Sequence, residues 1–334
     1  MSKKKELGQF YTTNSKYITE GLLDIFPKGA TIVEPFAGNW DLLNIVKDKY
    51  KIEAYDLDPK NPETEERNSI LNPPDYRGKW VFTNPPYLHK TRTKEKMIFE
   101  KYKVMDLYKA SMLTMLEAEG GILIIPLNFI CDRDDEFRKR FLSKFEIKRF
   151  KVFEKPVFDD TDIPICAFSF TKKENVEQDL NVIFLPKGEE KKFKIKLEEG
   201  YTIGSEIFNL EQSNIKIKRL INVKERPELS YIHIKCIDSG TEEGKIQMFW
   251  DREKYYGNEN KKSYITVSFD QHIPIKYQKA LVIDFNKKLN IYRNKYNSMF
   301  LSNFKSCGKD MIRKRISYTL AYIIMSNILY EYGF

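Results

Sequence analysis

The sequence predicts an α/β protein: a doubly wound, mostly parallel sheet, followed by a C-terminal region of mixed structure. Short apolar runs that read as buried strands alternate with helical patterns over about 170 residues, which is typical of parallel sheets with helices on both faces. The strand-like runs are residues 30–33, 52–55, 79–83 and 122–126. Polar residues or prolines end these runs, so ligand-binding loops are expected there.

The chain has 334 residues, which is enough for about two domains, and its character changes near Val176. Beyond that point helical periodicity fades and lysines interleave with aromatic residues, and residues 191–196 alternate like a basic strand. We therefore expect a first domain over residues 1–174 and a second over 175–334. Helices are expected over residues 97–119 and 310–332.

The charge distribution supports this division. Residues 1–170 contain 28 Lys and Arg against 27 Asp and Glu, whereas residues 171–334 contain 29 against 21, a net charge of +8. An excess of basic residues in one part of a chain favours a polyanionic partner. The second half is therefore the candidate nucleic-acid-binding region.

The composition argues against membrane insertion, secretion and a metal site. No apolar stretch reaches the ~18 residues that span a membrane, and no apolar segment of a secretory signal follows the N-terminus. The four cysteines are scattered without a C-x-x-C pair, which favours reduced thiols. His233 and Cys236 have no second pair to complete a metal site. We expect a cytoplasmic protein without a bound metal.

Two strand ends carry residues suited to a nucleotide-like ligand. The first run ends in Glu34, Pro35, Phe36, Ala37 and Gly38, before a helical pattern. A strand, a glycine turn and a helix present backbone N–H groups to such ligands. Asp56 ends the next run, 22 residues after Glu34. An acid at that distance is suited to bind ribose hydroxyls.

The third strand end carries the candidate catalytic loop. Residues 79–83 run into Asn84, Pro85, Pro86 and Tyr87. Pro85 pushes Asn84 toward an extended backbone, and the two prolines stiffen the loop. The Asn84 side-chain oxygen and the Pro85 carbonyl become adjacent acceptors beside a flat ring, which suits a planar group with an exocyclic amine. A second Asn-Pro-Pro at residues 72–74 lacks the preceding apolar run and the following aromatic residue, so we interpret it as an ordinary loop.

Together with residues 9–12 (Gln-Phe-Tyr-Thr), these motifs occur in an order that is specific. Residues 7 to about 170 resemble the γ-class amino DNA methyltransferases, the adenine-N6 enzymes of restriction–modification systems. The resemblance implies the class I S-adenosylmethionine-dependent methyltransferase fold with a C-terminal target-recognition domain. It also implies S-adenosylmethionine as the cofactor.

The resemblance assigns roles position by position. The cofactor-binding positions are Tyr11, Thr12, Thr13, Glu34, Phe36, Gly38, Asp56, Leu57 and Asn68. The catalytic positions are Asn84, Pro85 and Tyr87, and Tyr87 and Phe158 are expected to stack on the target base. The implied partners are double-stranded DNA, whose target base must be flipped out, and a cognate restriction endonuclease acting on the same site.

Two positions depart from the family pattern. Trp40 stands where the family usually has a second glycine, and Asn68 stands where it usually has an aspartate facing the cofactor amine. Asn68 is expected to accept that hydrogen bond without charge. Two alternatives stay open: another amino methyltransferase, acting on RNA adenine, cytosine N4 or a protein glutamine, and a nucleic-acid-binding module without catalysis.

Overall fold

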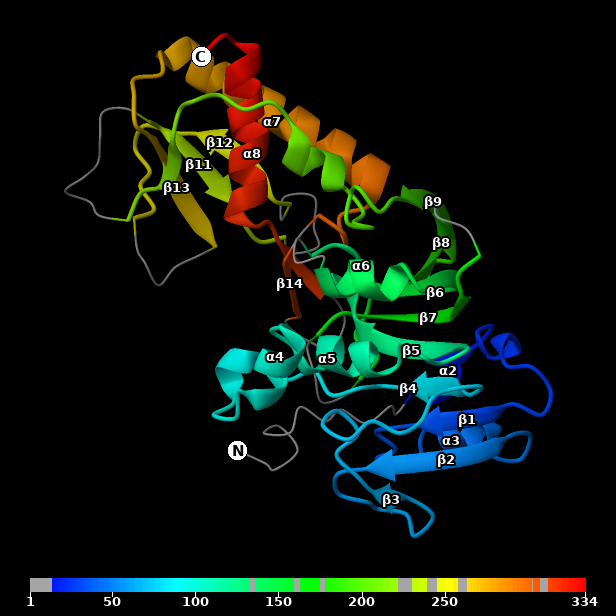
Figure 1. Ribbon diagram of the computed structural model, residues 1–334. Helices are drawn as coiled ribbons and strands as arrows, with labels where there is room; N and C mark the ends of the chain where they lie inside the picture. The colour runs from blue at the N-terminus through cyan, green and yellow to red at the C-terminus, as the bar shows by residue number, and fades with distance from the viewer. Residues whose placement is uncertain are drawn as a thin grey trace. The chain divides into compact units, whose positions relative to one another are not determined.

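The chain forms two compact units, residues 1–203 and 204–334 (Figure 1). The computed structural model describes residues 14–132, 136–158, 163–174, 178–221, 230–238, 245–257, 263–301, 303–306 and 312–334. The boundary between the units lies after Ile203, whereas the sequence predicted it after residue 174. The reason is that strands β8 (Gln178–Leu185) and β9 (Glu189–Ile195) continue the sheet of the first unit. The basic alternation of residues 191–196 belongs to the edge strand of that sheet, where exposed lysines discourage further pairing.

The first unit is built on a nine-stranded sheet with the order β3-β2-β1-β4-β5-β7-β6-β8-β9. The strands preceding β8 are β1 (Thr31–Glu34), β2 (Lys51–Asp56), β3 (Glu65–Glu66), β4 (Trp80–Thr83), β5 (Gly120–Pro126), β6 (Phe145–Phe153) and β7 (Ile165–Lys172). Strands β1 to β5 pair in parallel, whereas β7 is antiparallel to both of its neighbours. The mostly parallel sheet predicted from the sequence is confirmed.

Helices flank this sheet on both faces. They are α2 (Ser15–Thr19), α3 (Leu43–Val46), α4 (Met97–Tyr102), α5 (Leu107–Thr114) and α6 (Glu136–Leu142), with short 3-10 turns η1 (Leu23–Ile25), η2 (Lys90–Arg92) and η3 (Leu127–Ile130). Successive strand residues point to opposite faces. On β6, Phe150 stacks on Phe168 within the phenylalanine cluster that reaches α6, whereas the Lys151 ammonium donates to the Ile18 carbonyl of α2. The sheet is therefore doubly wound.

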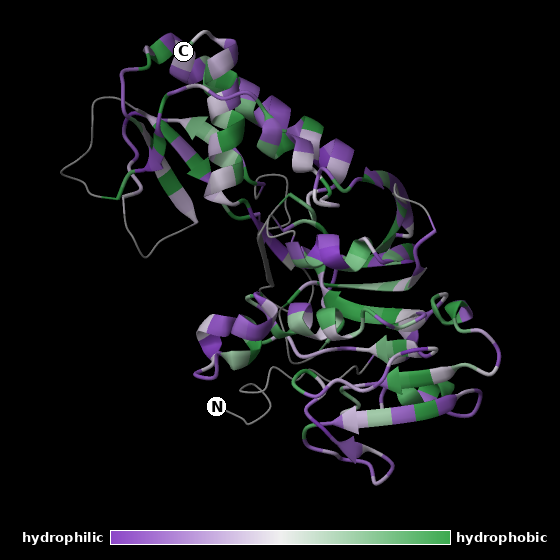
Figure 2. Ribbon diagram, in the orientation of Figure 1, coloured by the Kyte–Doolittle hydropathy of each residue, from purple (hydrophilic) through white to green (hydrophobic). Residues whose placement is uncertain are grey.

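The centre of the sheet is fully apolar. All seven residues of β5 are buried, and the strand is coloured as hydrophobic in Figure 2. Gly120 and Gly121 open this strand because a side chain at either position would collide with the neighbouring strands: an added Cβ at Gly121 would lie 2.0 Å from the Val81 carbonyl oxygen. The close approach brings β4, and the loop that follows it, tightly against β5.

The helix expected over residues 97–119 is interrupted. Helix α4 ends because Lys103 adopts a left-handed backbone with φ of +55°, and α5 begins after Asp106. No glycine marks this break in the sequence, so the apolar periodicity on both sides predicted one continuous helix. The break turns residues 104–107 back toward the segment after β4.

The second unit contains a four-stranded antiparallel sheet with two helices. The sheet order is β10-β13-β11-β12, formed by β10 (Ile217–Arg219), β11 (Ile232–Lys235), β12 (Gln247–Trp250) and β13 (Tyr264–Phe269). The other elements are η4 (Ser205–Asn209), α7 (Ile275–Tyr296), the pair β14 (Asn303–Ser306) and β15 (Ile312–Arg315), and α8 (Tyr318–Glu331). The helix expected from residue 310 begins only at Tyr318, where the Ser317 hydroxyl accepts from the Leu320 N–H as an N-cap. No helix among the described residues is long and apolar enough to cross a membrane.

Candidate functional site

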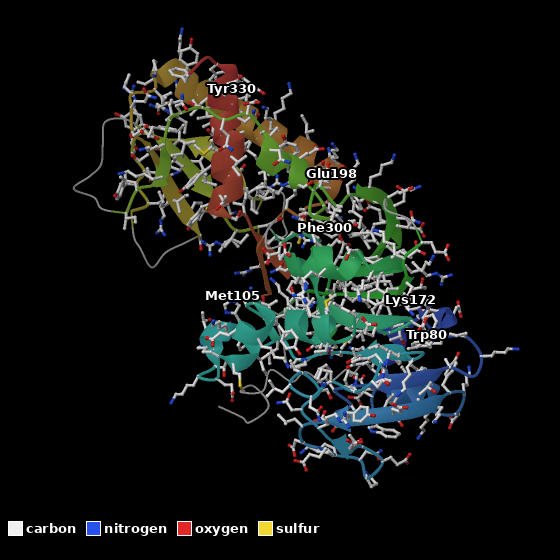
Figure 3. All side chains as sticks on the ribbon, in the orientation of Figure 1. Trp80, Met105, Lys172, Glu198, Phe300 and Tyr330 are labelled. Atoms are coloured by element: carbon white, nitrogen blue, oxygen red, sulfur yellow. The ribbon has the colours of Figure 1, made fainter. Side chains whose placement is uncertain are left out.

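The candidate site lies at the carboxyl edge of the first unit's parallel strands. Strands β1, β2 and β4 end there in Glu34, Asp56 and Thr83. Figure 3 labels Trp80, at the start of β4, near Lys172 at one edge of the sheet, and Met105 at the opposite, carboxyl edge. Strand β1 lies between β2 and β4, so the chain reverses its direction across the sheet at this point. Open α/β sheets bind their ligands at such a point.

The turn after β1 is fixed by hydrogen bonds to its own strand end and to that of β2. The Phe36 N–H donates to Glu34 Oε1 at 3.0 Å, and the Gly38 N–H donates to Asp56 Oδ2 at 2.8 Å. The second oxygen of Asp56 accepts from the Asp58 N–H at 2.8 Å. The Asp56 carboxylate thus fastens two turns together, and each of its oxygens retains a lone pair for a ligand hydroxyl.

Glu34 is a buried acid, only 2% exposed. Burial raises the pKa of Glu34 to about 8; the Phe36 N–H opposes this rise, and the neighbouring Asp56 carboxyl adds to it. At neutral pH the carboxyl of Glu34 is therefore mostly protonated, and its main role visible in the structure is to shape the turn.

Trp40 occupies the position where the family pattern has glycine, and it adopts the backbone conformation that glycine favours. Its φ is +65°, and its N–H donates to the Ala37 carbonyl at 2.8 Å. The indole is 4% exposed and donates from Nε1 to the Thr64 hydroxyl at 2.7 Å. Burial of this large side chain holds a backbone conformation that is otherwise unfavourable by about 1–2 kcal/mol. The departure at Trp40 preserves the left-handed turn.

A cavity of about 250 Å³ opens at this edge. Its lining includes six predicted site residues: Phe36, Gly38, Asp56, Leu57, Asn68 and Asn84. The structure thus brings together residues from the ends of three strands and from the turn at Asn68. The remaining lining residues are Arg67, Ser69, Ile70, Leu71, Pro86, Leu88, Thr93, Glu95, Ile98, Phe99 and Leu107.

Two of these additional residues belong to motifs of the sequence: Pro86 is part of the Asn84–Tyr87 loop, and Leu107 belongs to the segment 106–108, which by resemblance is a helix motif lining an adenine pocket. The sequence did not indicate the others, because none of them belongs to a recognisable motif. Two backbone hydrogen bonds fold the segment after β4 against the start of α5: Leu107 N–H to the Leu88 carbonyl at 2.9 Å, and Lys90 N–H to the Met105 carbonyl at 2.8 Å. This contact brings an apolar wall, including Ile98 and Phe99, to the polar edge of the sheet. The wall is a tertiary feature without a local signal.

An ionic cluster around the buried Lys109 lies at the start of α5. The Lys109 ammonium lies 3.5 Å from Asp106 Oδ2 and 3.4 Å from Asp132 Oδ2, and the Lys109 side chain is 2% exposed. Burial raises the pKa of Asp106, and the positive charge of Lys109 opposes that rise. The cluster holds the first turn of α5, and with it Leu107, in place.

Asn68 differs in role from the sequence expectation. Its Oδ1 accepts from two backbone N–H groups of its own turn, Ile70 at 3.3 Å and Leu71 at 3.1 Å. The oxygen therefore faces the turn, and the opposite orientation of the amide would set N–H groups against N–H groups. The polar group that the Asn68 side chain can offer to the cavity is its NH₂, which is a donor.

The Asn84 loop divides between the cavity and the core. Asn84 and Pro86 line the cavity, whereas Pro85 and Tyr87 are buried. Tyr87 is 6% exposed, and its hydroxyl lies 2.8 Å from the Ile124 carbonyl oxygen and also contacts the side-chain oxygen of Asn84. Burial raises the pKa of Tyr87 well above its usual value, so the phenol keeps its proton.

The two rings expected to stack on a base do not line the cavity. Phe158, like Tyr87, is buried, with 5% of its surface exposed. Tyr11, Thr12 and Thr13 lie outside the described residues. Asn72, the alternative asparagine, is exposed and also lies outside the cavity lining.

Comparisons with known proteins give structural likenesses at low identity. No known family matches the sequence, and no curated protein matches it. The modification subunit of a candidate type I restriction enzyme from Vibrio vulnificus is similar over 60% of this chain and 51% of its own, with 14% identity and a TM-score of 0.42. The type I restriction–modification methyltransferase subunit from Streptococcus thermophilus is similar over 60% and 53%, with 16% identity and a TM-score of 0.41.

A candidate class I S-adenosylmethionine-dependent methyltransferase from Listeria monocytogenes is similar over 51% of this chain and 61% of its own, with 10% identity and a TM-score of 0.39. The matched region spans about half of the two restriction-system subunits. Likenesses of this degree carry no argument for function. The sheet order and the antiparallel β7 themselves give the first unit the architecture of class I S-adenosylmethionine-dependent methyltransferases, as the sequence predicted.

Proposed function

We propose that this protein is a restriction–modification DNA methyltransferase that transfers a methyl group from S-adenosylmethionine to N6 of adenine. One observation carries the proposal: a single cavity is lined by the glycine turn, Asp56 and Asn84, which end three neighbouring strands. A ribose-binding acid and an amine-binding amide are thus on the same cavity. Methyl transfer from a nucleoside cofactor to an amine needs this combination.

The residues present fit the cofactor. Asp56 would accept hydrogen bonds from the ribose hydroxyls, since each of its oxygens accepts one backbone N–H and has a lone pair left. Leu57 is 48% exposed and lines the cavity, so it can cover a purine ring. Phe36 and Gly38 would hold the methionine part, together with Tyr11, Thr12 and Thr13. When bound, the cofactor supplies an electrophilic methyl group on a sulfonium.

Asn84 and Pro85 would bind the target amine. The Asn84 side-chain oxygen and the Pro85 carbonyl oxygen accept its two N–H groups, which turns the nitrogen lone pair out of conjugation with the ring. Both acceptors stabilise the positive charge that develops on this nitrogen during transfer. No cysteine nucleophile takes part. In the proposed complex, Phe158 becomes exposed and stacks on the flipped base, an interaction of about 1–3 kcal/mol.

The second unit would recognise the DNA target. It contains 22 Lys and Arg against 14 Asp and Glu, a net charge of +8. Cations also lie over an aromatic side chain of β12: the Lys279 ammonium is 4.7 Å and the Arg252 guanidinium 5.4 Å from the Trp250 ring. Basic and aromatic groups in one unit suit contacts with phosphates and bases. A restriction endonuclease with the same target sequence is the proposed cellular partner.

Transfer of a tritiated methyl group tests this function. We expect incorporation into duplex DNA and not into RNA or protein, and N6-methyladenine as the product. Asn84→Ala should abolish transfer while cofactor and DNA binding persist, and Asn72→Ala, in the matched Asn-Pro-Pro sequence outside the cavity, should remain active. Methylation of RNA or protein instead of DNA, or an active Asn84→Ala variant, would contradict the proposal.

A further inference from the structure

We propose that residues 89–96, the segment that follows the Asn84 loop, bind the DNA backbone beside the flipped nucleotide, with Arg92 and Lys94 as the phosphate-binding side chains. This inference rests on the proposed function and extends it, because it assigns a DNA contact to the first unit as well as to the second. The evidence is the charge of the segment, the position of its side chains around the cavity and the hydrogen bonds that hold it in place.

Positive charge is concentrated in this segment. Residues 89–96 contain four Lys and Arg residues and one Glu, whereas residues 1–170 as a whole contain 28 Lys and Arg against 27 Asp and Glu. A local excess of this kind, in a part of the chain that is otherwise balanced, favours a polyanion. A base that enters a cavity leaves its phosphates outside, so the rim of the cavity is where such an excess would meet DNA.

Two of the four cations are already engaged, and two are not. The Lys96 ammonium donates to two carbonyl oxygens of the segment itself, and the Lys90 ammonium lies 3.7 Å from Glu100 Oε1. Arg92 and Lys94 are exposed, and neither side chain forms an ion pair or a hydrogen bond within the part of the chain that the structure describes. Their charges are therefore available to a ligand.

The side chains of the segment divide between the cavity and solvent. Thr93 and Glu95 line the cavity that also contains Asn84, whereas Arg92 and Lys94, which alternate with them, are exposed and do not line it. The backbone at Thr93 is extended, with φ of −128° and ψ of 151°, and in an extended chain successive side chains point to opposite sides. The two free cations thus lie at the rim of the cavity in which the target amine would bind.

The segment is fastened near both of its ends. At its start, the Thr91 N–H donates to His89 Nδ1 at 3.2 Å, and the Lys90 N–H donates at 2.8 Å to the carbonyl of Met105, which Figure 3 labels at the carboxyl edge of the sheet. At its end, the Lys96 ammonium closes the segment on its own carbonyl oxygens. Less conformational freedom is then lost when the segment binds phosphates.

The double substitution Arg92→Gln and Lys94→Gln tests this role, because it removes both charges and keeps polar side chains. Binding of a fluorescein-labelled duplex that the wild-type protein methylates is measured by anisotropy over a range of salt concentrations, with S-adenosylhomocysteine present to prevent turnover. We expect the slope of log Kd against log salt to fall by about 2, one for each lost phosphate contact, and Kd at low salt to rise at least about tenfold. The Kd for S-adenosylmethionine and the free energy of unfolding should stay at the wild-type values.

The control is the double substitution Lys28→Gln and Lys49→Gln. These exposed lysines precede β1 and β2, at the amino edge of the same sheet, so the control changes the net charge equally but away from the cavity. Its salt slope and its Kd for the duplex should equal those of the wild-type protein.

Three outcomes would overturn the inference. An unchanged salt slope in the Arg92 and Lys94 variant would show that these cations do not bind phosphates, and an equal fall in the control would show that only the net charge matters. Weaker binding of S-adenosylmethionine with an unchanged salt slope would mean that the two cations bind the cofactor carboxylate instead. If the wild-type protein methylates no DNA, the proposed function fails, and the same salt series on a duplex of mixed sequence still decides whether Arg92 and Lys94 bind phosphates.

Discussion

Replacement of Asn68 by aspartate separates two ways in which this side chain could contact the cofactor purine. Asn68 Oδ1 accepts from the N–H groups of Ile70 and Leu71, so the cavity receives the NH₂. A donor at this position pairs with a ring nitrogen of adenine, such as N1, and not with the exocyclic amine. Asn68→Asp keeps the acceptor for the turn and changes the group facing the cavity from donor to acceptor.

The expected magnitudes follow from these contacts. The two backbone hydrogen bonds become charge-assisted, so the free energy of unfolding of the variant should equal that of the wild-type protein or exceed it by up to about 2 kcal/mol. In the cavity, the lost hydrogen bond and the new repulsion between two acceptors together cost at least about 1.4 kcal/mol, which is a tenfold weaker affinity for S-adenosylmethionine. If the exocyclic amine faced residue 68, a charge-assisted bond of about 1.5–3 kcal/mol would tighten binding instead.

Isothermal titration with S-adenosylmethionine and S-adenosylhomocysteine measures the sign of this effect. The two ligands share the adenosine part, and only the first has a positively charged sulfur, so an effect at the purine should be equal for both. Asn72→Asp adds the same charge to the same turn outside the cavity and should leave both affinities unchanged. Tighter binding of both ligands by Asn68→Asp would refute the assignment of Asn68 as a donor.

Three further variants test the surrounding structure. Trp40→Gly should destabilise the protein by about 2–4 kcal/mol in urea denaturation, since the loss of the buried indole exceeds the relief of its left-handed backbone; equal stability would contradict this. The pKa of Glu34 is raised to about 8 in the folded protein, so the contribution of its carboxyl to the free energy of unfolding is fully present below pH 4.5 and is lost as the pH rises through 8. Between these values the free energy of unfolding should fall with a slope of up to about 1.4 kcal/mol per pH unit. Glu34→Gln should remove this slope, and an unchanged slope would exclude Glu34 as its source. Asp56→Ala should weaken cofactor binding at least about tenfold in calorimetry. It should also destabilise the unliganded protein by about 2–4 kcal/mol in urea denaturation, because the N–H groups of Gly38 and Asp58 lose a charged acceptor. Unchanged affinity would remove Asp56 from the cofactor site.

Elements with a local signal could be predicted from the sequence. The strands that end at Glu34, Asp56 and Thr83 are apolar runs followed by polar residues or proline, and the structure contains them within one or two residues of the expected bounds. The three turns that follow these strands meet at one cavity, as the rule for switch points in open sheets predicts. The part of the site that could be predicted from the sequence was therefore the set of turns at the strand ends.

Features that depend on tertiary contacts could not be predicted. Lys103 adopts a left-handed backbone without being glycine, so the break between α4 and α5 left no trace in the apolar pattern. The apolar wall at Ile98 and Phe99 depends on that break. The edge strand at residues 189–195 was assigned to the wrong domain because lysine alternation occurs in an edge strand as well as in a nucleic-acid-binding surface.

The polar residues of the cavity edge share one local geometry, and it determines which variants are informative. Glu34, Asp56 and Asn68 each accept a hydrogen bond from the backbone N–H two residues ahead, at Phe36, Asp58 and Ile70. Asp56 and Asn68, which line the cavity, are therefore side chains that also fold their own turns. An alanine at Asp56 or Asn68 removes both roles, so the loss of affinity in Asp56→Ala has to be compared with its measured loss of stability. Asn68→Asp keeps an oxygen acceptor, so it leaves the turn formed and reports on the contact with the ligand.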